Sequence, residues 1–504
     1  MAKICLCLTG ETLEENLLLL NKYRPYIDMV ELRADYLTKD EQLQIRKFPA
    51  MTDIPCILTI RRTIDGGQFS EGEARRTTLF ARALAFAEQD TRKNYAYIDL
   101  EEDFNVPSLL DAAMAFGTRV IRSFHSMNEP VKNIAERMKK MRTTGYEIPK
   151  IACMPRTLDD VTDLFRQSKE IGDFDHILVA MESIGLPTRI LANKLKNFLT
   201  YVSPIETAGK MPILGHLDPI TLNEMYNFRT IDNNTCVFGI TGYPLNATSS
   251  PKIHNKWFKK YNMNAVFIPI RAHTVKQALA FCEEVNIGGL SVTVPHKESI
   301  IEELHTVSAE VNRINACNTV VRRGMEWAGY NTDAFGFERS LCEFLGTNSL
   351  ARKKVSIIGS GGAAKAVAYV IKKLHGKACV FNRTVGRARQ LAEYFGFKYA
   401  ALGAENMELI KKYSDVIIQT TSVGMDINNE NFFEEENNPL YFYKFSGKEA
   451  VYDVIYVPNK TPFLTAAEKA GCRICNGLSM LEYQAEKQFA LYTGKTISHY
   501  EEKK

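Results

Sequence analysis

Three glycines and the residues around them form the pattern in this sequence that points most directly to chemistry. The apolar run Val355–Ile358 ends in Gly359, Gly361 and Gly362, and a helical pattern then leads to a second apolar run at Ala378–Phe381. A glycine-rich turn lets a pyrophosphate approach the backbone and the positively polarised N-terminus of the following helix. The spacing therefore predicts a dinucleotide-binding unit, and an ordinary connection between a strand and a helix is the alternative interpretation.

The residues after the second run indicate which dinucleotide is bound. In many NAD-binding units this run ends in Asp or Glu, which binds the ribose hydroxyls. Here it is followed by Asn382, Arg383 and Thr384. An acidic residue would repel a 2′-phosphate, whereas an arginine attracts it and can bind it in a bidentate manner. The sequence therefore predicts NADP as the cofactor.

A lysine and an aspartate in separate motifs are of the types needed for proton transfer to a substrate oxygen. Lys297 follows a predicted strand and a proline turn in GGLSVTVPHKE, and Asp333 lies in GYNTDAFG. A lysine beside an aspartate can exchange a proton with an alcohol or ketone oxygen during hydride transfer. Asn318 and Asn331 lie in neighbouring motifs and extend the predicted rim of this site. A solvated surface lysine is the alternative for Lys297 taken alone.

Hydroxyl groups gather before a helical pattern that begins with proline. The segment GYPLNATSSPKIHN carries Thr248, Ser249 and Ser250 directly before Pro251. Hydroxyls and the free N–H groups of a helix N-terminus suit a carboxylate ligand, but the same residues also serve as helix caps. Taken alone, the segment favours capping.

A third set of polar residues lies in the first 225 residues. Lys150 stands in the apolar segment Ile148–Ala152. Only a neutral amine attacks a ketone, and an ordinary lysine pKa of about 10.4 leaves little neutral amine at pH 7. Desolvation increases that fraction. His125 can transfer a proton near neutral pH. These residues predict imine or carbanion chemistry. The alternatives are a salt-bridge network and a buried structural histidine. The cations that could bind a carboxylate and hydroxyls of a substrate are Arg33, Arg61 and Arg189.

Eight short β runs alternate with helical stretches before residue 226. This number of strands in about 220 residues predicts a (β/α)8 barrel, which carries its chemistry at the carboxyl ends of its strands. We expect Lys150 to open its strand and therefore to point into the barrel. The runs are 4–8, 29–33, 56–61, 95–100, 119–124, 150–154, 176–181 and 212–215, and the polar residues at their ends are Glu31, Arg33, Arg61, Asp65, Ser123 and His125.

The polar stretch Tyr226–Thr235 is the predicted linker between two differently organised regions. After it, two α/β units are expected to form two lobes with a cleft between them, where a cofactor meets a substrate. The final helical pattern, Ser479–Tyr492, is expected to pack on the first lobe. The predicted α/β chain therefore has a barrel at 1–225, a substrate lobe at 236–335 joined by helix 479–504, and a Rossmann lobe at 351–475.

The composition is typical of a soluble globular protein, with 45% hydrophobic and 24% charged residues and a net charge of +4. No basic run indicates nucleic acid, no apolar run approaches the roughly 20 residues of a membrane helix, and the N-terminal apolar run is too short for a secretory signal. Eleven scattered cysteines suit a reducing cytosol. Cys472 and Cys475 are predicted to face opposite sides of a strand, as structural residues. We expect a cytoplasmic protein with small-molecule substrates, no metal, no nucleic acid and no membrane contact.

Residues 236–504 resemble shikimate dehydrogenase in the ordered segments GYPLNATSSPKIHN, SVTVPHKE, NACNT, GYNTDAFG, GSGGAA, NRT, TTSVGM, DVIYVPNKTP and NGLSMLEYQA. The resemblance implies that Lys297 and Asp333 are the catalytic pair. Two residues differ from that family's pattern, with Ala247-Thr248 in place of His-Ser and Ser291 in place of Asn. The implied substrate contacts are Thr248, Ser250, Thr293, Asn318, Asn331, Tyr456 and Gln484, and the implied NADP contacts are Gly359, Ser360, Gly361, Gly362, Ala363, Asn382, Arg383 and Thr384.

Residues 1–225 resemble type I 3-dehydroquinate dehydratase in VELRADY, IRRTIDGG, IRSFH, PKIACMP and GLPTR. The resemblance implies that Lys150 forms an imine with the C3 ketone and that His125 moves the C2 proton to the leaving C1 hydroxyl. Asp65 stands for the family's catalytic Glu, and Thr188 for a Ser. The closing loop aligns with Pro212–His216, where His216 replaces a substrate-binding Gln. The implied substrate-orienting residues are Glu31, Arg33, Arg61 and Arg189.

Together the two resemblances imply a bifunctional enzyme of the shikimate pathway. The barrel is expected to dehydrate 3-dehydroquinate, and the second half to reduce the product to shikimate with NADPH. Two alternatives remain open at this point. In the first alternative, the barrel is a degenerate binding or scaffold module. In the second, the second half of the chain is a catabolic quinate or shikimate oxidoreductase that prefers NAD. Arg383 argues against the second alternative.

Overall fold

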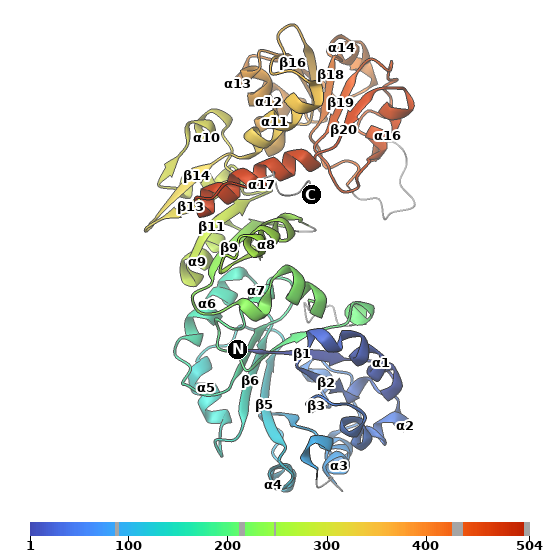
Figure 1. Ribbon diagram of the computed structural model, residues 1–504, viewed down its shortest axis with the longest axis vertical. Helices are drawn as coiled ribbons and strands as arrows, with labels where there is room; N and C mark the ends of the chain where they lie inside the picture. Colours follow the sequence, from blue (N-terminus) through green and yellow to red (C-terminus); the bar gives the residue numbers. More distant parts are fainter. Residues whose placement is uncertain (86–89, 211–216, 246–247, 426–436, 498–504) are drawn as a thin grey trace. The chain divides into compact units, whose positions relative to one another are not determined.

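The computed structural model describes residues 1–85, 90–210, 217–245, 248–425 and 437–497 (Figure 1). The chain folds into two compact units, Met1–Ile287 and Gly288–Lys504. Among the described residues, no helix is long and apolar enough to cross a membrane.

Eight parallel strands dominate the first unit, in the order β7-β6-β5-β4-β3-β2-β1-β8. They are continuous apolar runs because strands in such a sheet are buried on both faces. The two end strands are joined by the amide of Asn197, whose Oδ1 accepts from Leu178 N and whose Nδ2 donates to Leu178 O, both at 2.9 Å. The sheet is thus a nearly closed barrel, which confirms the predicted fold; its strands are Lys3–Leu8 (β1), Met29–Arg33 (β2), Cys56–Thr59 (β3), Tyr97–Glu101 (β4), Arg119–Ser126 (β5), Ile148–Cys153 (β6), Ile177–Ala180 (β7) and Leu199–Val202 (β8).

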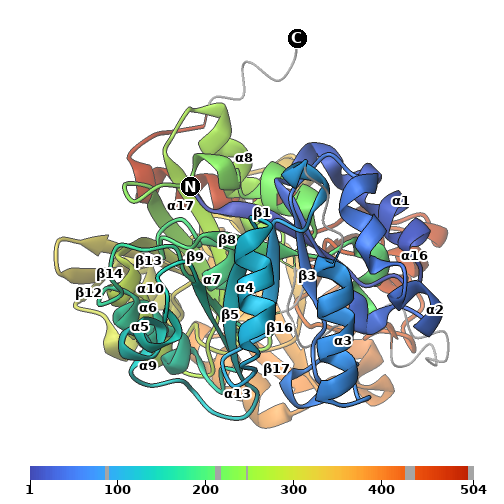
Figure 2. The same cartoon turned by 90° about the horizontal axis from the view of Figure 1, so that it is seen from below.

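Helices lie outside this ring of strands (Figures 1 and 2). Local sequence fixes where some of them begin. Thr157 Oγ1 accepts from Asp159 N at 3.2 Å, and Asp160 Oδ2 accepts from Thr157 N at 3.1 Å, which forms a capping box at the start of α6. The helices are Leu13–Tyr23 (α1), Lys39–Gln42 (α2), Glu73–Leu84 (α3), Pro107–Ala115 (α4), Ile134–Met141 (α5), Leu158–Ser168 (α6) and Leu186–Ile190 (α7).

Two of the strand predictions need correction. The eighth strand is Leu199–Val202, whereas the predicted run 212–215 lies outside the described residues. The true strand is only four residues long and carries two hydroxyl side chains, which conceals it in a hydrophobicity pattern. The sixth strand begins at Ile148, so Lys150 is its third residue rather than its first. Pro149, which lacks a backbone N–H, hides that start.

The first unit also contains a parallel strand pair with two helices. The predicted linker Tyr226–Thr235 lies before this pair, and its side chains Tyr226, Phe228 and Ile231 are buried. The predicted domain boundaries stay a prediction. The elements are Cys236–Gly242 (β9), Ser250–Lys260 (α8), Ala265–Arg271 (β10) and Val275–Val285 (α9).

A six-stranded sheet has the order β10-β9-β11-β13-β14-β12. Its strand β11 starts at Ile287, where the first unit ends. β13 runs antiparallel to both β11 and β14. The elements of the second unit that belong to this part are Ile287–Val292 (β11), Thr306–Val307 (β12), Ala309–Ile314 (α10), Thr319–Arg323 (β13), Glu326–Tyr330 (β14) and Asp333–Leu345 (α11).

A second six-stranded sheet is entirely parallel, in the order β17-β16-β15-β18-β19-β20. The strand order reverses between β15 and β18, which is the switch point where α/β sheets bind ligands. This confirms the predicted Rossmann-type sheet. Its elements are Lys354–Ile358 (β15), Gly362–Lys373 (α12), Lys377–Asn382 (β16), Val385–Phe395 (α13), Lys398–Ala401 (β17), Met407–Lys412 (α14), Val416–Gln419 (β18), Ala450–Asp453 (β19), Pro462–Lys469 (α16), Arg473–Cys475 (β20) and Leu478–Thr493 (α17).

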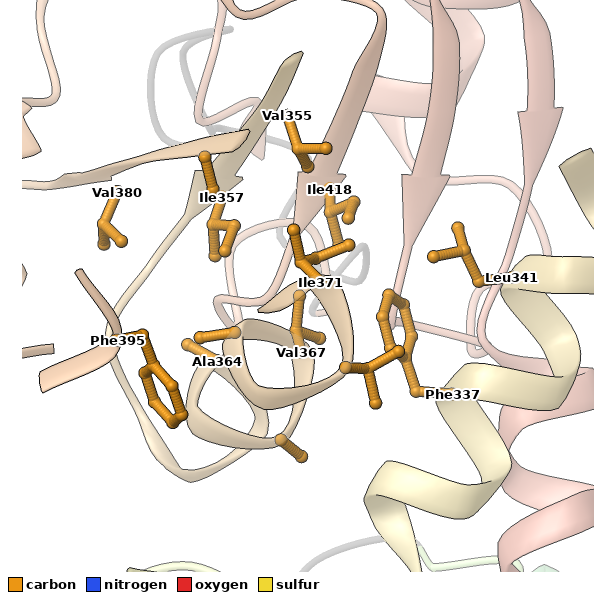
Figure 3. Close-up of a cluster of buried hydrophobic side chains, with 14 of the residues drawn as sticks. Phe337, Leu341, Val355, Ile357, Ala364, Val367, Ile371, Val380, Phe395 and Ile418 are labelled. Carbon is orange, nitrogen blue, oxygen red and sulfur yellow. The ribbon is translucent and has the colours of Figure 1, made fainter. Parts of the chain in front are cut away.

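Each face of this sheet has its own hydrophobic cluster. Figure 3 shows Val355 and Ile357 packed with Ile371 and with Phe337 of α11 on one face. Alternate strand residues form the cluster on the other face. Cys472 belongs to that second cluster and Cys475 packs against the first, so the two cysteines lie on opposite sides of the sheet.

Helix α17 packs along α11. Gly336 permits this close approach, because a Cβ at that position would lie 2.5 Å from Met480 O. Gly289 permits a second one, because a Cβ there would lie 2.3 Å from the Tyr492 ring. The last described helix is therefore fixed against β11 and α11 of the same unit.

Two candidate active sites

The buried amine of Lys150 is the centre of the barrel site. Its Nζ donates to Asp99 Oδ2 at 2.8 Å and to Tyr201 Oη at 3.0 Å, and lies 3.9 Å from Glu31 Oε1. These residues come from β6, β4, β8 and β2. Burial alone would raise the pKa of Asp99, but Arg61 and Lys150 outweigh burial and hold that pKa well below its usual range. Lys150 thus faces a fixed negative charge.

Arg61 joins the same network from the end of β3. Its Nη2 lies 2.8 Å from Asp99 Oδ1, and its Nη1 donates to Glu101 Oε1 at 2.5 Å and to Ser123 Oγ at 3.0 Å. Glu101 also pairs with Arg76 of α3, which is completely buried. Buried charges must be paired and hydrogen-bonded, and here each cation has an anionic partner.

Sequence reasoning missed Asp99, Glu101 and Tyr201. The available signal was an acidic residue within an apolar strand, since YIDLE places Asp99 and Glu101 two positions apart on one face of β4. Tyr201 had no such signal because its strand was assigned elsewhere.

His125 lies on β5 and is held in the neutral state. Burial, followed by the positive charges of Arg61 and Lys150, places the pKa of His125 well below its ordinary value. Within the described part of the chain its Nδ1 makes no hydrogen bond. A neutral imidazole can accept a proton, so His125 has the state that a base requires.

The remaining predicted barrel residues divide into two groups. Glu31 accepts from Thr59 Oγ1 at 2.8 Å beside the lysine, and Arg189 of α7 is buried, which lowers its pKa to about 10. Arg33 instead forms a bidentate pair with Asp35, at 2.9 and 2.8 Å.

Asp65 is paired with Arg62 at 2.6 Å, in the turn after β3. Gly67 in that turn is required, because a Cβ there would lie 2.2 Å from Arg61 O. His216 lies outside the described residues.

The second site is built around the predicted pair Lys297 and Asp333. Lys297 Nζ donates to Asp333 Oδ2 at 2.5 Å. Asn318 Nδ2 donates to Asp333 Oδ1 at 2.8 Å and lies 3.4 Å from Gln484 Oε1, so α17 contributes to the site. The structure thus brings these four predicted residues together in the second unit.

Asn331 has a structural set of bonds. Its Nδ2 donates to Ala316 O at 2.8 Å, and its Oδ1 accepts from Ala334 N at 3.1 Å at the start of α11. Thr293 and Tyr456 are partly buried.

Thr248 and Ser250 lie in the first unit, before α8. Thr248 Oγ1 accepts from Ser250 N at 3.3 Å, while the cap residue Ser249 forms no side-chain cap bond among the described atoms. The hydroxyl of Thr248 therefore binds an N–H group at the start of α8, as the capping interpretation expects, whereas the hydroxyl of Ser249 does not. Ala247 lies outside the described residues.

Ser291, the second departure from the family pattern, anchors α17. Its Oγ donates to Gln488 Oε1 at 3.0 Å and lies 3.1 Å from Tyr492 Oη. Gln488 Nε2 in turn donates to Thr319 Oγ1 at 3.0 Å.

The glycine turn after β15 has the geometry of a phosphate cradle. Gly359 has φ of +110°, and a Cβ there would lie 2.5 Å from Thr420 Oγ1. A Cβ on Gly361 would meet open space, so its backbone is accessible. A Cβ on Gly362 would lie 3.1 Å from Lys297 Cδ, which places the turn directly against the lysine side chain. Ser360 and Ala363 complete the turn.

The residues after β16 are available to a ligand. Asn382 Nδ2 donates to Thr384 O at 3.0 Å, which shapes the turn. Arg383 is exposed and makes no ion pair within the described ranges. The glycine turn after β15 has an accessible backbone, and the exposed Arg383 follows the next strand, β16. This combination fits a dinucleotide that carries an extra phosphate.

Three family models match successive parts of the chain. They are type I 3-dehydroquinase at residues 4–233, the shikimate dehydrogenase substrate binding domain at 240–320, and shikimate / quinate 5-dehydrogenase at 344–441.

Similar proteins cover one half or nearly the whole chain. A bifunctional 3-dehydroquinate dehydratase/shikimate dehydrogenase from Arabidopsis thaliana, described as chloroplastic, is 29% identical over 488 residues, which span 93% of this chain and 78% of that protein. A shikimate dehydrogenase (NADP(+)) from Caldanaerobacter subterraneus is 38% identical over 272 residues, 53% of this chain and 94% of that protein. A solved dehydroquinate dehydratase and shikimate dehydrogenase from S. pombe is 22% identical, with a TM-score of 0.42, and covers 98% of this chain and 96% of its own.

The depressed pKa of His125 predicts an imidazole that stays neutral well below pH 6.5. An unfolded histidine titrates near 6.5. Because the folded state binds this proton more weakly, the contribution of His125 to the free energy of unfolding falls as the pH drops below about 6.5. We expect the His125 ring signal in NMR, assigned by its loss in His125→Asn, to stay unshifted from pH 8 to 6. A titration midpoint at or above 6.5 would contradict this electrostatic description.

Proposed function

Because the chain belongs to the shikimate dehydrogenase family and carries a type I 3-dehydroquinase domain ahead of that half, we propose that one polypeptide dehydrates 3-dehydroquinate and reduces the product to shikimate. The chain is a bifunctional enzyme, with a lyase domain and an oxidoreductase in one sequence. The observation that carries the proposal is that each half contains a largely buried lysine bonded to an aspartate, Lys150 to Asp99 and Lys297 to Asp333.

In the barrel, Lys150 first gives up to solvent water the proton that pairs it with Asp99, and its amine then attacks the C3 ketone of 3-dehydroquinate, with loss of water, to form an imine. His125, which is neutral, removes the C2 proton, and the electrons of that C–H bond pass into the imine as an enamine. The enamine expels the C1 hydroxyl, which takes a proton from His125 and leaves as water. Water then releases 3-dehydroshikimate and restores the amine of Lys150.

The other polar residues of the barrel orient the substrate in this proposal. Arg61 and Arg189 are buried cations that suit its carboxylate and hydroxyls, and Glu31 accepts hydroxyl protons beside Lys150. Arg33 orients the substrate in this proposal while it is paired with Asp35. Asp65, which pairs with Arg62 in the turn after β3, keeps the catalytic role that the family resemblance implies, and His216 keeps its implied role in substrate binding.

In the second half, Lys297 donates a proton to the ketone oxygen of 3-dehydroshikimate while Asp333 holds its amine in position. NADPH, when bound, would supply the hydride that the carbonyl carbon accepts. Asn318 orients Asp333 through its 2.8 Å bond, and Gln484 extends the same polar surface. The other proposed contacts for substrate hydroxyls and carboxylate are Thr248, Ser250, Thr293, Asn331 and Tyr456.

The cofactor site combines the glycine turn with the residues after β16. Gly361 leaves its backbone open to a pyrophosphate at the start of α12, Gly359 turns the chain with a φ of +110°, and Ser360, Gly362 and Ala363 complete the turn. Arg383 binds the 2′-phosphate, and Asn382 and Thr384 hold the turn around it. The contact of Gly362 with Lys297 supports hydride and proton delivery to one carbonyl group.

A degenerate barrel is the weaker interpretation, because Lys150, His125 and Arg189 are present and the first two share one charged network. A quinate oxidoreductase that prefers NAD is disfavoured by the free Arg383. All eleven cysteines are unpaired, which supports a reducing compartment, and we propose the cytoplasm. We keep the proposed domains at 1–225, 236–335 with helix 479–504, and 351–475.

Borohydride reduction tests the imine. With 3-dehydroquinate present, we expect a stable adduct on Lys150, located by peptide mass spectrometry. Lys150→Met removes the amine but keeps the volume, so it should abolish the adduct and lower the dehydration rate by at least about 10³-fold, with dehydrogenase activity retained. Absence of both the adduct and dehydration in the wild type would rule out a catalytic barrel.

Substitution of Lys297 separates the two sites. Lys297→Ala removes the proposed proton donor, so the dehydrogenase rate should fall about 10²–10⁴-fold. Dehydration by the same protein should be unchanged. If both rates fall together, the model of two independent sites is wrong.

Arg383 controls cofactor choice in this proposal. Arg383→Ala should raise KM for NADP about 10-fold or more, because it removes a charge-assisted hydrogen bond to phosphate, while KM for NAD changes little. Arg389→Ala is the matched control, since Arg389 is an exposed arginine of the same region that pairs with Glu393. Wild-type turnover with NAD that equals turnover with NADP would refute the cofactor assignment.

A further inference from the structure

The helix that carries Arg189 is too short to fix its own position. α7 has five residues, and an isolated helix of that length is unstable in water. On the barrel side it is held by Thr188, whose Oγ1 donates to Gly185 O at 2.7 Å and accepts from Ala180 N at 3.1 Å. Gly185 packs tightly there, because a Cβ would lie 2.4 Å from Ala180 O. β7 therefore holds one side of the turn before Arg189.

The other side of α7 packs on β10, which is the end strand of its six-stranded sheet. Arg271 is the last residue of β10, and its Nη1 donates to Ser183 Oγ at 2.8 Å. Ser183 lies in the turn between β7 and α7. Covering an edge strand in this way satisfies a surface that would otherwise be open to pairing. The turn is thus held by β7 at one end and by Arg271 in the middle.

The neighbouring helices α6 and α9 contact each other through residues outside the turn before α7. α6 and α9 pack through Phe165 and Phe281, whose ring centroids are 5.6 Å apart, and Glu284 lies 3.3 Å from Arg166 and 2.5 Å from Lys169. These ion pairs join the end of α6 to α9 through the partly buried Glu284. None of them involves the turn before α7. Arg271 is distinguished by its bond to that turn.

We propose that Arg271 is a positioning residue for the dehydratase, although it lies in the part of the chain that matches the dehydrogenase substrate-binding domain. By binding Ser183, Arg271 fixes the turn that sets the place of Arg189, so the affinity of the barrel for its substrate depends on the second enzyme's strand β10. This inference rests on the proposed dehydration of 3-dehydroquinate and on Arg189 as a cation for that substrate.

The test compares full-length variants in steady-state dehydration. Arg271→Ala and Ser183→Ala each remove the same hydrogen bond, so each should raise KM for 3-dehydroquinate on the order of 10-fold and change kcat less than about twofold. Combining both substitutions should add no further loss, because they remove one interaction. Arg271→Lys should recover part of the affinity, since its amine can still donate to Ser183.

Arg166→Ala is the matched control, because it removes an ion pair between α6 and α9 and leaves the turn before α7 intact. We expect its KM to equal that of the wild type. An unchanged KM in both Arg271→Ala and Ser183→Ala would overturn the inference, and so would an equal rise in Arg166→Ala, which would indicate general loosening. A wild-type protein that does not dehydrate 3-dehydroquinate would instead overturn the proposed function, so the wild-type rate distinguishes the two failures.

Discussion

Neutralisation of buried positive charge is the constraint on which the barrel depends. Lys150, Arg61 and Arg76 lie within the protein, and Asp99 and Glu101 are the anions that make their burial possible. An unpaired buried charge costs several kcal/mol, so each partner fixes the next. Burial, together with the positive charges of Arg61 and Lys150 in this network, lowers the pKa of His125. One electrostatic arrangement therefore stabilises the fold and helps to keep His125 in the neutral form that a base requires.

In the second half, one lysine–aspartate pair forms the centre of the site, and helix packing holds it in position. Asp333 is held by Lys297 and Asn318, and the orientation of Asn318 depends on α17 through Gln484. That helix is seated by close contacts at glycines and by an ion pair between Arg339 of α11 and Glu486. A larger residue in place of Gly336 would push α17 away from α11. It would thereby displace Gln484, which lies many residues away in the sequence.

Much of this organisation could be predicted from sequence, for physical reasons that differ between residues. Lys297, Asp333 and the glycine turn lie in short motifs whose spacing fixes their local geometry. Strand periodicity and length were enough for the barrel and the Rossmann-type sheet. The role of Asp99 could not be predicted, because it depends on which strands meet across the barrel. The eighth strand was misplaced for the same reason, since Leu199–Val202 is recognisable only by its neighbours.

The bond between Arg271 and Ser183 also has a consequence for the order in which the enzyme matures on the ribosome. All eight barrel strands precede residue 203, but β10 emerges about 60 residues later, some 3–12 s at ~5–20 residues per second. A nascent barrel therefore completes its sheet before the turn at Ser183 gains its partner. Because α17 is made after every other element of the second site, dehydration capacity arises first and reduction last, in the sequence in which the substrates are consumed.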